Sequence, residues 1–222
     1  RNAATLQAFF TELGERKHSI RAVSIDMNGG YEKALREGLP GAEICFDPFH
    51  VCQLAGRAVD EVRRAEWREQ GKSKTAGGKW VKGVRWSLLK APERQSVDQL
   101  AALHEVSGAN KRLYRAFLLK EELRLLYHLP DPALAERHLS AWLAWASRSQ
   151  LGAFVKLART LRARRDGILA AIRLGLSNGR MEGLNSKVRL LSHRSFGFHG
   201  PKPLIALIYL CCSHLTINPP LR

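Results

Sequence analysis

Residues 20–26 have the sequence IRAVSID and residues 42–50 have the sequence AEICFDPFH, and these two stretches decide the fold class. Each begins with a short run of apolar and β-branched side chains, which is typical of a strand. Each run ends on an aspartate, Asp26 in the first stretch and Asp47 in the second, and apolar residues at helical spacing follow. Strands that alternate with helices favour parallel pairing, and functional groups collect at the carboxyl ends of such strands. We therefore predict a small parallel sheet with both aspartates at strand ends.

Most of the remaining chain is predicted to be helical, with breaks at glycines and prolines. The predicted helices cover residues 3–16, 31–38, 51–69, 96–106, 112–126, 133–147, 151–174, 180–193 and 204–215. Residues 71–90 differ, because glycines and basic side chains surround Trp80 and Trp86 there. This composition indicates a flexible basic connection with aromatic anchors. The predicted fold class is mixed α/β and predominantly helical.

The charge of the chain points to a polyanionic partner. Lys and Arg number 36 against 20 Asp and Glu, which gives a formal net charge of +16. Such an excess favours nucleic acid as the partner, although a ribosomal or other basic soluble protein would share it. No Walker motif, G-x-G-x-x-G or G-x-S-x-G occurs, so nucleotide hydrolysis and acyl transfer have no support.

The composition also limits the cellular locations that can be expected for the protein. Apolar residues make up 45% of the chain, so a core can form, and no apolar run is long enough to span a membrane. The cysteines form no C-x-x-C pair and lie among apolar neighbours, which predicts small core residues in a reducing compartment. They are Cys45, Cys52, Cys211 and Cys212. We expect a cytoplasmic, nucleoid-associated protein with no membrane partner.

Asp26, Asp47 and His50 are candidate site residues near the two strands. A carboxylate directly after a strand can hold a divalent metal through its oxygens, but an aspartate there also commonly caps a loop. Asp47 and His50 frame the sequence DPFH, which is typical of a turn that leads into a helix. From these residues alone, a structural and a functional interpretation both stay open.

Glu182 is a third candidate, on the helix predicted over residues 180–193. Helical spacing places Glu182, Asn185 and Arg189 on one face with Ser186. The opposite face carries Leu184, Val188 and Leu191. One face can therefore pack while the other presents a carboxylate, an amide and a guanidinium to a metal and a phosphate. A surface helix of mixed polar residues is the alternative interpretation.

Lys187, Arg189 and Arg194 make the same helix basic, and the aromatic sequence SFGFH follows at residues 195–199. Basic residues interleaved with aromatic ones suit single-stranded or junction DNA, where bases stack and phosphates pair. A solvated basic face is the alternative. Two further DNA-binding candidates, in the basic connection, are Lys82 and Arg85.

Several ordered blocks of the sequence resemble one bacterial family. They are AVSIDM at residues 22–27 with Tyr31 after it, LPGAEI at 39–44, FDPFHV at 46–51, KGVRWSLLK at 82–90, LLKEELR at 118–124 and SNGRMEGLN at 177–185. The chain is similar, over nearly its whole length, to the insertion-sequence transposases of the ISL3 group.

This resemblance implies an incomplete RNase H-like core that is interrupted by an all-α insertion. The first part of the core would cover residues 1–70, the insertion residues 71–161, and the second part residues 162–222. By motif match, Asp26 resembles the second aspartate of an Asp-Asp-Glu triad and Glu182 its closing glutamate, both as metal ligands. Two Mg²⁺ or Mn²⁺ ions are implied, which would stabilise the attacking and leaving oxygens of an in-line displacement at phosphorus.

The family resemblance also bears on the accessory residues and the partners. The sequence from Asp47 to His50 is similar to the C/D-x-x-H signature of related transposases, which implies a role in shaping the site or holding DNA. Asn185 is a further accessory candidate. The implied partners are transposon-end and target DNA, and other copies of the chain in a homodimer or larger synaptic assembly. The first catalytic aspartate is expected upstream of residue 1, so the chain alone is expected to be inactive.

Three alternatives to a DDE transposase stay open. The chain could be a non-catalytic DNA-binding remnant with the same fold and basic faces. It could be an unrelated RNase H-like nuclease or resolvase. The third alternative is a basic RNA-binding structural protein, which would bind RNA more tightly than DNA and need no metal.

Overall fold

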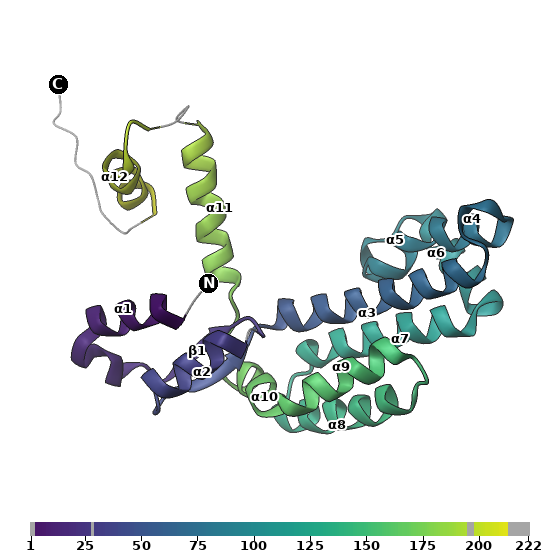
Figure 1. The fold of residues 1–222 in the computed structure, drawn as a ribbon, viewed down its shortest axis with the longest axis horizontal. Coiled ribbons are helices and arrows are strands. Elements are labelled where there is room, and N and C mark those ends of the chain that lie inside the picture. The colour runs from purple at the N-terminus through teal and green to yellow at the C-terminus, as the bar shows by residue number, and fades with distance from the viewer. Residues whose placement is uncertain (1–2, 28, 195–197, 213–222) are drawn as a thin grey trace. The chain divides into compact units, whose positions relative to one another are not determined.

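The structure, a computed structural model, describes residues 3–27, 29–194 and 198–212. The chain divides into two compact units, Arg1–Ser177 and Asn178–Arg222, and each has an architecture of its own (Figure 1). Helices dominate both units, and the strands that the structure describes lie in the first. The predicted class, mixed α/β and predominantly helical, is confirmed. No described helix combines the length and the apolar character that a membrane span requires.

The first unit opens with a small sheet. β1 (Ala22–Ile25) and β2 (Glu43–Phe46) pair in parallel, with Ile25 opposite Phe46 at the carboxyl end. The elements around them are α1 (Ala3–Leu13), a 3₁₀ helix (Gly14–Ser19) and α2 (Gly29–Gly38), which connects the strands. Both predicted strands and their parallel pairing are therefore confirmed.

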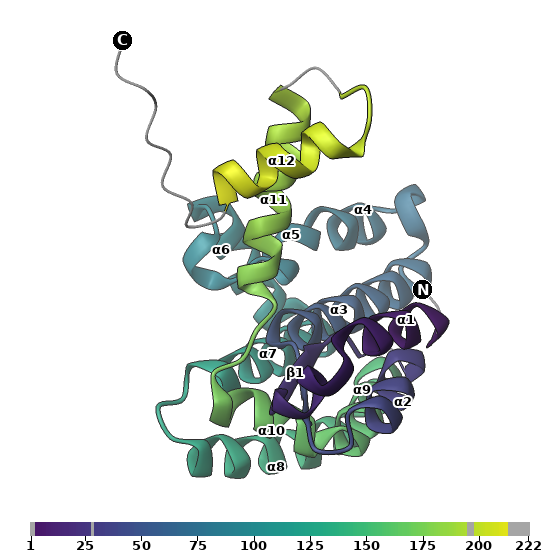
Figure 2. The ribbon, with the colours of Figure 1, turned by 90° about the vertical axis from the view of Figure 1, so that its left-hand side faces the viewer.

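One helix covers β2 at very close range. α10 (Arg165–Leu174) packs against this strand, and Figure 2 shows the unit from the side of the sheet. A Cβ added at Gly167 would lie 2.7 Å from the carbonyl oxygen of Ile44 and 2.7 Å from the ring of Phe46. Because real Cβ atoms do not approach other atoms so closely, the helix reaches the strand only with glycine at this position.

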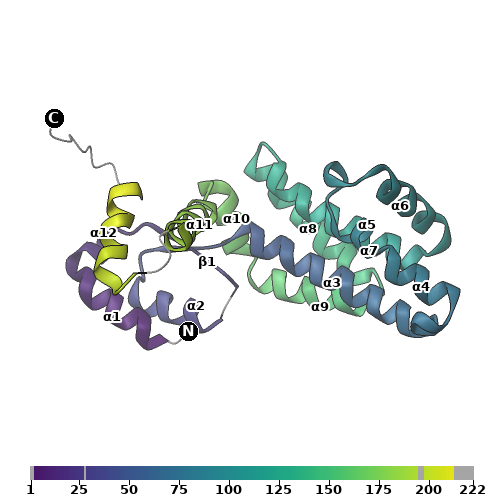
Figure 3. The same ribbon diagram turned by 90° about the horizontal axis from the view of Figure 1, so that it is seen from above.

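The rest of the first unit is helical and is arranged around α3 (Pro48–Glu69). The other elements are η2 (Lys72–Lys74), α4 (Ala76–Gly83), α5 (Arg85–Leu89), η3 (Pro92–Arg94), α6 (Val97–Ala109), α7 (Lys111–Leu125), η4 (Leu126–His128), α8 (Pro132–Arg148) and α9 (Gly152–Ala163). α3 packs against α4, α5, α7 and α9, and α8 packs against α9 (Figures 1 and 3). Val51, Val59 and Val62 of α3 are buried in one hydrophobic core that also includes Phe46 of the sheet. α3 thus connects the sheet to the helical part.

The prediction of a flexible connection over residues 71–90 is wrong. This segment forms α4 and α5. Three of its apolar side chains are buried, with at most 3% of each exposed, namely Val81, Val84 and Leu88. These residues lie three and four positions apart, so they form one apolar stripe that packs on α3. The lysines and glycines around the stripe hid this pattern from an interpretation based on composition.

Other elements differ in detail from their predicted bounds. The helix predicted over residues 151–174 is two helices, α9 and α10, because the backbone leaves helical geometry at Arg164 (φ −119°, ψ 17°). α1 ends at Leu13 and continues as a 3₁₀ helix. Cys45 is buried as predicted, whereas Cys211 is exposed, so that cysteine is not a core residue among the described side chains.

The second unit consists of α11 (Gly179–Arg194) and α12 (Pro201–Cys212), which pack against each other. None of its described side chains is fully buried. Three parts of the predictions lie outside the described residues: residues 195–197 of the SFGFH sequence, the end of the last predicted helix at residues 213–215, and Asn28 in the loop predicted after the first strand.

Candidate functional site

The parallel register brings the two predicted aspartates to the same edge of the sheet. Asp26 follows Ile25 of β1, and Asp47 follows Phe46 of β2. The ladder continues one residue past the strands, because the Asp47 N–H donates to the carbonyl oxygen of Ile25 at 3.0 Å. Both carboxylates therefore lie at the carboxyl ends of the strands, where parallel sheets usually carry functional groups.

Asp26 is in direct contact with His50. The distance from His50 Nε2 to Asp26 Oδ1 is 2.6 Å, and His50 lies in the first turn of α3. The Asp26 side chain is 40% exposed and that of His50 is 28% exposed, so the pair is held in place and still open to solvent. The rings of Phe49 and His50 form a T-shaped pair with centroids 5.5 Å apart, which further restricts the imidazole.

Asp47 supports the same site through the start of α3. Its side chain is the N-cap of α3 and accepts a hydrogen bond from the His50 N–H at 3.4 Å, with Pro48 in the first helical position. Asp47 is only 1% exposed. The turn interpretation of the DPFH sequence is confirmed, because Asp47 caps the helix, and the cap also fixes the backbone that presents His50 to Asp26. The functional interpretation stays a prediction.

Cys52 lies two residues beyond His50 on α3, and burial keeps its side chain in the thiol form at neutral pH. Burial raises its pKa to about 11, and the nearby charge of Arg124 opposes this shift less strongly than burial favours it. Because the thiolate is the form that binds metals and attacks electrophiles, Cys52 stays an inert thiol.

Glu182 belongs to the second unit. It lies in the first turn of α11, and its N–H donates to the carbonyl oxygen of Asn178 at 2.9 Å. Glu182, Asn185 and Arg189 are exposed. The side chains predicted to form the opposite face are half-buried, namely Leu184, Val188 and Leu191. α11 thus has the predicted polar and apolar faces, and a negative charge near its N-terminus is electrostatically favourable.

The predicted DNA-binding side chains are exposed in both units. On α11 they are Lys187, Arg189 and Arg194, and around α4 and α5 they are Lys82 and Arg85. Arg85 differs from the others because it has local partners: its Cζ lies 5.0 Å from the centroid of the Trp86 ring, and its Nε lies 3.6 Å from Asp60 Oδ1.

Asp60 is a charged centre that the sequence interpretation missed. Its carboxylate lies 2.7 Å from Arg63, 2.8 Å from Arg64 and 3.6 Å from Arg85. Burial alone would raise the pKa of Asp60, but the hydrogen bond and charge of Arg63 and the charges of the other two arginines lower it overall. The spacing of Asp60, Arg63 and Arg64 on one helix is a signal for the first two pairs. Only the fold brings in Arg85.

Comparisons with known proteins show the family of the chain. The sequence matches the model of a transposase family, DDE_Tnp_ISL3, over residues 1–208. The chain belongs to the ISL3 family of DDE transposases. Its relatives include the transposase for insertion sequence element IS1557 of Mycobacterium tuberculosis, in strains CDC 1551 and H37Rv, at 36% identity over 93% of this ISL3-family chain. The transposase for insertion sequence element IS1001 of Bordetella parapertussis is 31% identical over 89% of it.

This ISL3-family chain spans about half the length of these relatives, 51% of the Mycobacterium proteins and 49% of the Bordetella protein. No solved structure matches it significantly.

Proposed function

We propose that this chain is part of a DDE transposase that cuts and joins DNA strands when an insertion sequence moves. The observation that carries the proposal is the Asp26–His50 pair, at the carboxyl edge of parallel strands, in a chain of the ISL3 transposase family. In this proposal the sheet with its neighbouring helices belongs to an RNase H-like core, residues 71–161 are the helical insertion, and Glu182 belongs to the second part of the core.

The carboxylates have the chemistry that divalent metal ions need. Mg²⁺ and Mn²⁺ prefer hard oxygen ligands, and the Asp26 side chain is 40% exposed at the end of a strand. Glu182 offers a second exposed carboxylate on an ordered helix. When bound, two such ions would stabilise the attacking and leaving oxygens of an in-line displacement at phosphorus. Asp26 and Glu182 are the proposed ligands that this chain contributes.

Other side chains would position the ligands and the DNA. His50 holds one carboxylate oxygen of Asp26 at 2.6 Å, so it fixes the direction of the second. Asp47 holds His50 through the helix cap. Such supporting contacts typically change metal affinity or activity by about 10–100-fold. On α11, Asn185 and Arg189 share the face of Glu182 and would contact DNA phosphates beside it, with Lys187 and Arg194 further along the helix.

The proposed partner is DNA, as transposon end and as target. The net charge of +16 provides the long-range attraction that phosphate binding requires. The enzyme would act as a homodimer or a larger assembly that holds two transposon ends together.

The test uses the full-length transposase, because the chain spans about half of its relatives. A labelled transposon-end duplex is incubated with Mg²⁺, and strand cleavage and DNA binding are measured separately. Asp26→Asn and Glu182→Gln should each abolish cleavage and leave binding within about twofold, since each removes one carboxylate charge from a proposed ligand. His50→Ala should slow cleavage by about 10–100-fold.

The matched control is Glu12→Gln, which neutralises an exposed glutamate of α1 and should keep wild-type cleavage. Retained cleavage in Glu182→Gln would refute the assignment of that residue. A wild-type protein that binds DNA but cleaves none, with every divalent metal tested, would favour the non-catalytic DNA-binding remnant.

A further inference from the structure

A basic groove starts beside the candidate site and follows α3. It is a cavity of about 670 Å³ between α3, α5 and α7. Its lining on α3 begins at Phe49, the neighbour of His50, and reaches Arg68 in the last turn. Six cationic and three carboxylate side chains line it, so the groove is positive overall.

A second cavity, of about 490 Å³, shares part of that lining. Arg64, Arg68 and Arg85 line both cavities. The second one adds Arg63, Trp67, Lys82 and Trp86, and no carboxylate lines it. We call Arg64, Arg68, Lys82, Arg85 and Trp86 the Trp86 patch. It lies at the far end of α3 from His50.

The Trp86 patch keeps a surplus of positive charge after its internal ion pairs are counted. Arg64 and Arg85 share the carboxylate of Asp60 with a third arginine, so one negative charge faces three positive ones. Among the described residues, no carboxylate lies within ion-pair distance of Arg68 or Lys82. The patch therefore offers several guanidinium and ammonium groups to an anionic ligand.

The side chain of Trp86 is exposed within this charged surface. Its side chain is 54% exposed, although tryptophan is among the residues that gain most from burial. The Arg85 guanidinium lies 5.0 Å from the centroid of the indole ring. An exposed aromatic ring beside cations is the arrangement on which unpaired bases stack while their phosphates are neutralised.

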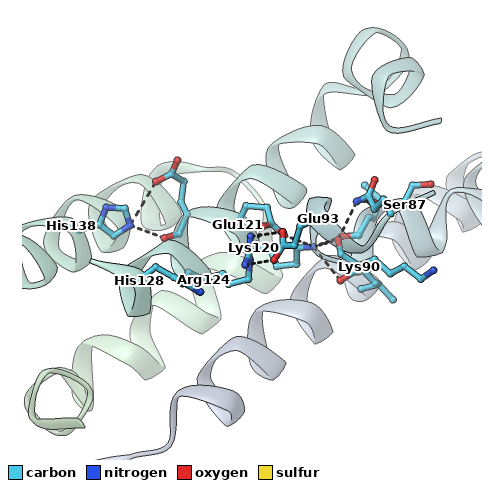
Figure 4. Close-up of polar contacts among 12 residues, drawn as sticks. Ser87, Lys90, Glu93, Lys120, Glu121, Arg124, His128 and His138 are labelled. Carbon is cyan, nitrogen blue, oxygen red and sulfur yellow. Dashed lines mark hydrogen bonds and ion pairs between the residues drawn. The ribbon is translucent and has the colours of Figure 1, made fainter. Parts of the chain in front are cut away.

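The element that carries Trp86 is held firmly. Lys120 of α7 reaches the C-terminal end of α5 and donates to the carbonyl oxygens of Leu88, Leu89 and Lys90 at 2.8, 3.2 and 3.1 Å (Figure 4). These bonds satisfy the last carbonyls of α5, which a helix end otherwise leaves unpaired. Ser87, next to Trp86, is buried. The indole is thus presented by an ordered helix, and less conformational entropy is lost when a base stacks on it.

We infer that the Trp86 patch binds an unpaired stretch of DNA, with phosphates on Arg64, Arg68 and Lys82 and a base stacked on Trp86. This inference rests on the proposed function, and it goes beyond it by naming single-stranded DNA as the form recognised. An intact duplex cannot occupy Trp86 in this way, because its bases are already stacked on one another. The exposed ring therefore distinguishes the two forms of DNA.

α3 sets the distance between the two places where DNA is held. At 1.5 Å of rise per residue, Arg64 and Arg68 lie roughly 20–27 Å along the helix from His50. A base-stacked strand, at about 3.4 Å per nucleotide, would cover this distance along α3 with roughly six to eight nucleotides.

The experiment measures binding of the 222-residue chain to fluorescein-labelled dT20, to a 20-base-pair duplex and to U20, by fluorescence anisotropy. Trp86→Ala should weaken dT20 binding about tenfold, and Trp86→Phe should stay within roughly threefold of wild type because it keeps a ring. Duplex binding should change less than about twofold in both variants, since phosphate contacts carry it.

The controls match the change in size and in charge. Leu134→Ala removes an exposed apolar side chain on α8, and it should leave dT20 binding unchanged. Lys82→Ala should weaken dT20 binding more than Lys156→Ala, which removes an exposed cation of α9 outside the patch. All variants should keep a cooperative melting transition, which shows that they are folded, because none of the altered side chains is buried.

The outcomes separate this inference from the proposed function. Equal losses for dT20 and duplex in Trp86→Ala, or no loss for either, would overturn the inference alone. Tighter binding of U20 than of dT20 by the wild-type chain would overturn the assignment to DNA. Failure of the wild-type chain to bind either DNA would overturn the inference and count against the proposed function as well.

Discussion

His50 shows how much of the candidate site depends on one contact between residues that are far apart in the sequence. Asp26 and Asp47 could be placed from the sequence, because each follows a strand and parallel strands end at a common edge. The contact at 2.6 Å between His50 and Asp26 could not, since it depends on the register of β1 with β2 and on the direction of α3. The DPFH turn supplies both the cap and the imidazole, and only the fold shows that it does both.

Gly167 lies where α10 approaches β2 most closely, so a larger side chain there should destabilise the protein. Gly167→Ala should lower the free energy of unfolding by about 1–3 kcal/mol, the usual cost of forcing extra atoms into a packed interior. The new methyl group would lie 2.7 Å from the carbonyl oxygen of Ile44, so α10 and β2 must move apart. Urea unfolding followed by circular dichroism measures the change.

The control for this change is another helical glycine with open space around it. A Cβ at Gly56 of α3 would meet no atom within 4 Å, so Gly56→Ala should stabilise the protein by about 0.5–1 kcal/mol. The two substitutions are chemically identical and should have opposite signs. If both stabilise, the close approach of α10 to β2 is not what requires glycine.

Among the elements, the sequence predicted those with a clear apolar period and failed where polar composition masked one. α3, α7 and α8 correspond to predicted helices because their buried residues recur every three or four positions. α4 and α5 have the same period in Val81, Val84 and Leu88, but glycines and lysines between them favoured the wrong prediction. Gly78 is not a sign of flexibility there: a Cβ would lie 1.3 Å from the Lys72 carbonyl oxygen, so tight packing requires it.

Buried polar contacts between elements could not be predicted from the sequence, for a different reason. Lys120 has helical spacing to apolar neighbours, yet nothing in the sequence says that it reaches the carbonyls at the end of α5 (Figure 4). Burial lowers its pKa, against the opposing hydrogen bond and charge of Glu121. Such a contact is defined by how α5 and α7 pack, which periodicity does not determine.

The carboxylate of Asp60 joins α3 to α5 through its contact with Arg85. Asp60→Asn should lower the free energy of unfolding by about 2 kcal/mol, because it leaves the buried Arg63 without a charged partner. The folded state lowers the pKa of Asp60, so its contribution is present above the unfolded value of about 3.9 and is lost as the pH falls through the folded value. The difference between variant and wild type should therefore be constant above about pH 5 and shrink below about pH 4.

The measurement is urea unfolding between pH 3 and pH 7. Glu37→Gln is the control, because its pair with Lys33 is at 3.9 Å with side chains 68% and 82% exposed, and such surface pairs contribute little. A loss for Asp60→Asn that does not diminish at low pH would mean that shape, and not charge, connects the two helices.

For the whole molecule, the net charge indicated the class of partner, but the sequence only partly revealed where the cations gather on the surface. The value of +16 indicated a polyanionic partner, and the family places the chain among transposases. The sequence predicted basic groups on the helix of residues 180–193 and at Lys82 and Arg85, but it did not show that Arg64 and Arg68 of α3 join the second group beside Trp86. Charge is a sum over residues, whereas the groups arise from helix faces and from helices that meet only in the fold.

The salt dependence of binding can test whether these local groups of cations, and not the total charge of the protein, bind duplex DNA. With about six phosphates contacted, the logarithm of the binding constant should fall against the logarithm of the salt concentration with a slope of about −5. Lys187→Gln with Arg189→Gln should make the slope shallower by about 1.8, that is 0.9 per lost contact. Lys33→Gln with Arg36→Gln removes the same charge from α2, where both cations already pair with glutamates, and should leave the slope unchanged. Equal changes would mean that net charge alone attracts DNA, and a flat salt response would exclude phosphate binding altogether.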